Sequence, residues 1–114
     1  MEGLIIKRPW IDYILEGKKV WEIRCCNTHK RRKIELIESG TGLIVGCCEL
    51  VDCIKLSFND FKQNLNKHCV QGDNLPYKNT FAWVMANAHR YTVPKKYKHP
   101  KGAIIWVKLK DEVK

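Results

Sequence analysis

The sequence predicts an α+β protein in which mostly antiparallel strands form a partly closed barrel with short helices at its rim. Apolar or alternating stretches of strand length recur along the whole chain. In contrast, only two segments carry the apolar spacing of a helix. The chain of 114 residues shows no internal repeat, low-complexity tract or linker, so we expect one domain over residues 1–114.

The strands of this barrel are predicted from buried or alternating apolar runs, of which there are six. They are residues 3–7, 18–25, 33–38, 43–56, 80–86 and 103–110. Within the long fourth run, Gly46 is expected to form a bulge that lets the strand bend. "SGTG" (39–42) has the composition of a turn, whereas residues 66–79 are expected to be irregular and 87–102 to form an extended basic loop.

Two short helices are predicted from their apolar faces and their end signals. In "RPWIDYILEG" (8–17), Pro9 suits the first helical position and Gly17 suits a left-handed cap after the last turn. In "SFNDFKQNL" (57–65), Ser57 is the expected N-cap and Asp60 stands at the spacing of a capping box.

The composition favours an intracellular protein with a polyanionic partner. The net charge is +9 and 45% of the residues are hydrophobic, as in a folded basic domain. No apolar run approaches the roughly 20 residues that span a bilayer, and no signal sequence is visible at the N-terminus. We expect a cytoplasmic protein, or a nuclear one if eukaryotic, that is monomeric and has no contact with a membrane.

The six cysteines are expected to be reduced thiols rather than disulfides or metal ligands. Two pairs are adjacent, Cys25–Cys26 and Cys47–Cys48, and neighbours in a strand point to opposite faces. The spacings of zinc knuckles do not occur. We therefore predict no metal and no cofactor.

Four segments in register resemble the ASCH domain family of the PUA-like superfold. "GKKVWEIR" fits the family signature G-x-K-x-x-E-x-R, and "KRPWIDYILEG" before it is similar to the family's passage from first strand to helix. "SGTGLIVGCCELVD" resembles the turn into the central strand, and "TFAWVMANAHRY" with "HPKGAIIWVKL" resembles the closing strands. The resemblance implies a PUA-like pseudo-β-barrel of five to six strands, with a cleft between the signature strand and the first helix.

The resemblance also implies a function. Family members have been proposed to bind RNA, some are amidohydrolases that remove acyl groups from N4 of cytidine, and another is described as a ribonuclease. We expect a domain that binds RNA or a nucleotide, with the amidohydrolase and the ribonuclease as alternatives.

The signature residues Lys19, Glu22 and Arg24 are the candidate site, for ligand binding or, in an enzyme, for catalysis. Glu22 and Arg24 are two residues apart and so share one face of a strand, where they can pair. Regular alternation puts Lys19 on the opposite face, so the three converge only if Lys19 lies in the turn before the strand. A lysine desolvated there can act as a base or bind an anion.

The match to the family's amidohydrolases is incomplete. Those enzymes use a lysine, a threonine and a glutamate. The lysine matches Lys19, but the threonine falls at Glu22. The glutamate comes from later in the chain, where Glu49, Asp52 and Asp60 remain open as counterparts. The resemblance thus supports a shared site more than a shared reaction.

Further candidate RNA contacts come from one aromatic and two basic segments. Trp10, beside Arg8 and Pro9 at the helix start, is placed to stack on a base. Both basic segments can follow a nucleic-acid backbone, and the second also places a tyrosine between its lysines, where it can stack on a base. They comprise Lys30, Arg31 and Arg32 in the first, and Lys95, Lys96, Tyr97 and Lys98 in the second.

Overall fold

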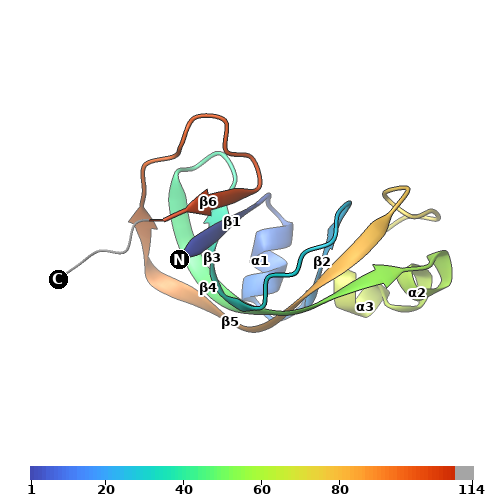
Figure 1. The fold of residues 1–114 in the computed structure, drawn as a ribbon. Helices are drawn as coiled ribbons and strands as arrows, with labels where there is room; N and C mark the ends of the chain where they lie inside the picture. The colour runs from blue at the N-terminus through green and yellow to red at the C-terminus, as the bar shows by residue number, and fades with distance from the viewer. Residues whose placement is uncertain (110–114) are drawn as a thin grey trace.

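The computed structural model describes residues 1–109, which form a six-stranded sheet and three short helices. Figure 1 shows the arrangement. The strands are β1 (Glu2–Ile6), β2 (Trp21–Arg24), β3 (Arg32–Glu38), β4 (Leu43–Leu56), β5 (Thr80–Lys96) and β6 (Trp106–Lys108). The helices are α1 (Trp10–Leu15), α2 (Phe58–Gln63) and α3 (Leu65–His68).

The sheet has the order β2-β5-β4-β3-β1-β6. Four of its pairings are antiparallel, and only β1 and β3 run parallel. The predicted α+β class with mostly antiparallel strands is therefore confirmed. The sheet does not close, however, because β2 and β6 stay at its two edges; the partly closed barrel of the prediction is in fact an open, curved sheet.

The long strands β4 and β5 carry the curvature. Their pairing shifts register at three places, including the predicted bulge between Ile44 and Gly46. At Gly46 the backbone passes so close to the His89 carbonyl and the Leu15 side chain that a methyl group would collide with both. In Figure 1 the bent pair carries β1, β3 and β6 near one end and β2, α2 and α3 near the other.

Two predicted segments differ from the structure. The segment 87–102 was expected to be a loop, but its first ten residues extend β5, so that Lys95 and Lys96 lie in a strand paired with Ile44 and Leu43. These residues are solvated and lack the apolar alternation of a strand, and they are held in an extended conformation by their pairing with β4. The last strand is also shorter than predicted, because residues 103–105 lie outside β6; Lys110, its predicted end, lies outside the described residues.

The helices begin and end close to the predicted residues. Pro9 is the N-cap of α1, so the helix begins at Trp10, one residue later than predicted. Gly17 adopts the left-handed φ of +81°. Ser57 and Asp60 form the predicted capping box of α2, with both hydrogen bonds at 3.0 Å. The four-residue helix α3 begins at Leu65, the predicted end of the second helix, and its other three residues fall in the segment that was expected to be irregular.

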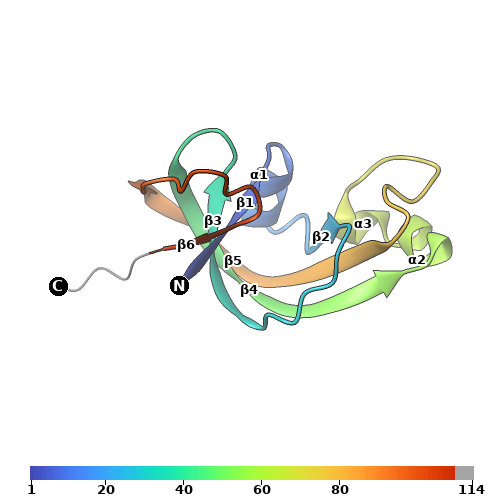
Figure 2. The ribbon, with the colours of Figure 1, turned by 45° about the horizontal axis from the view of Figure 1, so that its top comes forward.

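The core lies between α1 and the sheet, with a smaller cluster where α2 and α3 cover the end of the sheet. Figure 2, the turned view, shows both helices beside the far ends of β4 and β5. Trp83 and Trp21 are buried in the core, and Trp106 is half-buried against it. The main cluster includes Leu4, Ile6, Ile11, Ile14, Ile34, Leu36, Leu50 and Trp83.

His68 is a buried structural residue of the smaller cluster. Its ring stacks on Phe61 at a centroid distance of 4.1 Å. Nδ1 accepts the Val70 N–H at 2.9 Å, so Nε2 carries the proton and donates to the Phe61 carbonyl at 2.6 Å. Burial lowers the pKa of His68, and the neighbouring Lys19 charge acts in the same direction.

This environment predicts a pH dependence of stability. As pH falls below the usual histidine range, the unfolded chain takes up a proton that the folded ring resists, so the free energy of unfolding decreases. Urea denaturation at neutral and mildly acidic pH measures this loss. We expect His68→Gln to lose less stability over this interval than the wild type, and His29→Gln, at an exposed position, to lose as much as the wild type. Equal losses in all three proteins would contradict the assignment.

Candidate functional site

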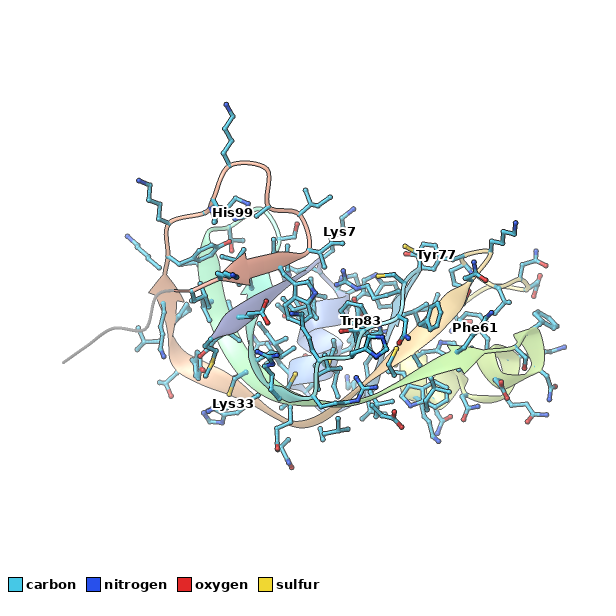
Figure 3. The ribbon with its side chains drawn as sticks, viewed as in Figure 1. Lys7, Lys33, Phe61, Tyr77, Trp83 and His99 are labelled. Carbon is cyan, nitrogen blue, oxygen red and sulfur yellow. The ribbon has the colours of Figure 1, made fainter. Side chains whose placement is uncertain are left out.

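A cleft of about 430 Å³ opens beside the signature strand. One wall comes from β1, α1 and the connection between them, with Ile5, Trp10 and Lys7. The other wall comes from β2 and the loop after α3, including Glu22 and Tyr77. In Figure 3, Lys7 and Tyr77 lie on opposite sides of the space between the two ends of the sheet.

Lys19 lies at this cleft because of the turn that follows α1. The left-handed conformation of Gly17 reverses the chain, and the N–H groups of Lys18 and Lys19 both donate to the Tyr13 carbonyl. Lys19 therefore precedes β2, which begins at Trp21, and does not follow its alternation. This is the condition under which its side chain meets Glu22.

The ammonium of Lys19 is enclosed on several sides, and the residue is only 1% exposed. Nζ donates to the His68 carbonyl and lies 3.8 Å from Glu22 Oε1. It also lies 5.0 Å from the ring centroid of Trp10, in cation–π geometry. Burial lowers the pKa of Lys19, while the Glu22 carboxylate raises it in partial compensation.

Glu22 and Arg24 share one face of β2, as their spacing predicts. Nε and Nη2 of Arg24 lie 3.0 and 2.9 Å from Glu22 Oε2. Nη2 also donates to the Ile5 carbonyl at 3.0 Å, and the guanidinium lies 5.4 Å from the ring centroid of Trp83. Oε2 of Glu22 is thus held by Arg24, while Oε1 faces Lys19.

The remaining predicted residues fall at different places. Trp10 is half-buried and lines the cleft, whereas Arg8 pairs with Asp12 at 3.1 Å and Pro9 caps α1. Neither Arg8 nor Pro9 is among the cleft-lining residues.

The two basic segments also lie outside the cleft lining. In the first, Lys30 and Arg32 pair with Glu2 at 2.9 and 3.6 Å, and Arg31 lies 3.8 Å from Asp52. In the second, Lys95 and Lys96 end β5, Tyr97 packs against a small apolar cluster, and Lys98 is exposed in the following loop.

Several cleft residues were not predicted from the sequence. His68 supplies a backbone carbonyl, which no side-chain motif can reveal. Tyr77 comes from the irregular segment and is 43% exposed, and Ile104 is 79% exposed at the rim. A large aromatic residue in a polar, irregular segment is the signal that could have identified Tyr77, whereas Ile104 lies in an apolar run that was predicted as a strand and carries no such signal.

An open, curved sheet of mostly antiparallel strands with three short helices defines a small α+β domain of the PUA-like class. The ASCH domain model matches residues 4–95, so the chain belongs to the ASCH domain family. Within residues 1–109 no helix is long and apolar enough to cross a membrane, and no group of three potential metal ligands occurs.

Solved structures of similar fold come from Zymomonas mobilis. The ASCH protein of that organism aligns with a TM-score of 0.65 and 12% identity, over 78% of this chain and 68% of its own. Two single-substitution mutants of ZmASCH align at 0.72 and 12% identity, each over 96% of this chain and over 89% and 87% of their own. No curated protein sequence matches the chain.

The opposing influences on Lys19 give a testable prediction. Because the Glu22 charge raises the pKa of Lys19 against the effect of burial, Glu22→Gln should lower that pKa further. Titration of the lysine ¹³Cε resonances by NMR measures it directly. Glu2→Gln is the matched control, since Glu2 pairs with Lys30 instead. An unchanged or raised Lys19 pKa in Glu22→Gln would refute the coupling.

Proposed function

We propose that this domain binds RNA, with a nucleotide held in the cleft beside Lys19, Glu22 and Arg24. The observation that carries the proposal is the buried ammonium of Lys19, next to a carboxylate and an arginine at an open cleft. This is a ligand-sized space with charged groups already in place.

Burial of these charges has no evident structural advantage. Removing ions from water costs several kcal/mol each, and well-packed hydrophobic residues often serve stability equally well or better. Groups with perturbed pKa values at a cleft are therefore candidates for function. Lys19 meets both conditions, because it is buried and its pKa is lowered.

The cleft also has the chemistry that a nucleotide requires. Glu22 Oε1 is not held by Arg24 and can accept from the exocyclic amine of a base. Trp10 and Tyr77 offer aromatic surfaces for stacking, and the exposed Lys7 offers a charge for a phosphate. The net charge of +9 attracts polyanions over a longer range.

Fluorescence anisotropy with a labelled single-stranded RNA tests this proposal. We expect Lys19→Met to weaken binding about tenfold or more, the value of a lost charge-assisted hydrogen bond. Lys67→Met is the matched control, because Lys67 lies equally close, at 5.0 Å, to the ring of Trp21 but is exposed and outside the cleft. Equal effects of the two substitutions would contradict binding in the cleft.

Tyr77→Ala guards against a loss of folding in Lys19→Met. Tyr77 is exposed in a loop, so its removal should leave the fold intact. Loss of one stacked base should cost about 1–3 kcal/mol of binding free energy. Unchanged affinity in Tyr77→Ala would argue against a base beside this ring.

The lowered pKa of Lys19 favours one alternative, an amidohydrolase. A neutral Lys19 amine could remove a proton from water as the water attacks the acyl carbonyl of an N4-acylated cytidine. The products would be the carboxylic acid and cytidine, with the proton returned to the departing amino group. Glu22, in contact distance of Nζ, would then stabilise the protonated lysine.

Absorbance measurements with N4-acetylcytidine test this alternative. A general base must be deprotonated, so turnover should rise with pH as Lys19 loses its proton and should be absent in Lys19→Met. The control Lys67→Met should turn over like the wild type. If the wild type binds RNA but releases no cytidine at any pH, the amidohydrolase is excluded and binding remains. Electrophoresis of the labelled RNA after incubation reports on ribonuclease activity in the same samples.

A further inference from the structure

A second cavity, of about 470 Å³, lies next to the first. It is lined by the loop between β2 and β3, by Arg32 and by two tryptophans that the first cleft does not include. The residues that matter here are Asn27, Lys30, Arg32, Trp83, Ile105 and Trp106.

The two cavities share a thin wall. Ile104 lines the first and its neighbour Ile105 lines the second. The Ile5 N–H donates to the Ile105 carbonyl at 2.9 Å, and Arg24 donates to the Ile5 carbonyl. On the other side of the wall, the Arg24 guanidinium from the first cleft lies over the Trp83 ring of the second. The wall is therefore about one side chain thick.

The second cavity combines cations with an aromatic surface. Lys30 and Arg32 outnumber the one carboxylate they pair with, that of Glu2. Nζ of Lys30 lies 5.1 Å from the ring centroid of Trp106, which is half-buried and stacked on Trp83 at 5.8 Å. The side chains of Lys30 and Arg32 are 30% and 56% exposed, so a phosphate can compete for them.

The amide of Asn27 completes the polar surface. Within residues 1–109 its side chain makes no hydrogen bond, so both its donor and its acceptor are available to a base edge. Cations for the backbone, a flat ring for stacking and a free amide are the elements of a single-strand binding groove.

We infer that the ligand is a single RNA strand whose adjacent nucleotides occupy both cavities, rather than a free nucleoside or nucleotide. One nucleotide lies in the first cleft and its neighbour lies in the second cavity. There the phosphate contacts Arg32 and draws Lys30 away from Trp106, and the base takes the place of the Lys30 ammonium over the Trp106 ring. The inference rests on the proposed function and specifies the class of its ligand.

Arg31 provides the matched control for Arg32. The two are neighbours in the same basic segment, so replacing either removes the same charge from nearly the same place. Arg31 is directed elsewhere: Nη1 donates to the Thr28 carbonyl at 2.9 Å, Nη2 lies 3.8 Å from Asp52, and the residue does not line the second cavity. Replacing either residue therefore reduces the general attraction of the protein for RNA equally, but only replacing Arg32 removes a direct contact with the phosphate.

The experiment compares ribonucleoside monophosphates with a short mixed-sequence oligoribonucleotide by isothermal titration calorimetry. We expect the wild type to bind the oligonucleotide more tightly than any monophosphate. Arg32→Gln should weaken the oligonucleotide about tenfold, leave the monophosphates unchanged and make the logarithmic salt slope shallower by about 0.7 for a lost phosphate. Arg31→Gln should weaken the oligonucleotide only by the small amount that the loss of general attraction causes, clearly less than Arg32→Gln.

Three outcomes would overturn the inference while the proposed function stands. In the first, Arg31→Gln and Arg32→Gln weaken oligonucleotide binding equally. In the second, Arg32→Gln weakens binding of the monophosphates as much as binding of the oligonucleotide. In the third, the wild type binds the oligonucleotide no more tightly than a monophosphate. If the wild type binds neither ligand, the proposed function itself fails, and the inference with it.

Discussion

The cleft depends on one interaction, the enclosure of the Lys19 ammonium. Its partners come from three elements: the ring of Trp10 in α1, the carboxylate of Glu22 in β2 and the carbonyl of His68 in α3. Two of these partners are held by other contacts, Glu22 by Arg24 and His68 by Phe61 and Val70. The ion cluster is thus fixed before any ligand arrives, and fixed charges need little reorganisation when a ligand binds.

The curved sheet places these elements around the ammonium. Three register shifts bend β4 and β5, so that β1 and β2 lie on either side of the cleft although neither is paired with the other. The absence of a side chain at Gly46 lets Leu15 of α1 approach the bend closely. The position of α1, which forms one wall of the cleft, therefore depends on backbone geometry in the middle of the sheet, away from the charged residues of the cleft.

Much of the fold was predictable because local signals agreed with the final packing. The capping box at Ser57 and the left-handed Gly17 are determined by nearby backbone, and the bulge at Gly46 is marked by a glycine within a long apolar strand. The second half of β5 was missed because it is solvated and contains Pro94, both unusual in a strand. Long-range pairing with β4 overrides these local preferences.

The candidate site was predictable only in part, for a similar reason. The shared face of Glu22 and Arg24 follows from alternation, and the family signature singles out Lys19. That Lys19 meets them depends on the turn after α1, and its deep burial depends on α3, a four-residue helix with too short a pattern to recognise. Tyr77 and Ile104 reach the cleft from loops whose paths depend on tertiary contacts.

The strand order has one more consequence, for association between molecules. An open sheet exposes unpaired N–H and C=O groups along its outer strands, and long exposed edges recruit strands from other chains. Here the longest strands, β4 and β5, are interior, and the outer strands β2 and β6 have only four and three residues. The backbone of Val20, the residue before β2, is also hydrogen-bonded: its N–H donates to the Lys67 carbonyl, and the Val20 carbonyl accepts from the Met85 N–H. A sheet that never closes is thereby left with little free edge for aggregation.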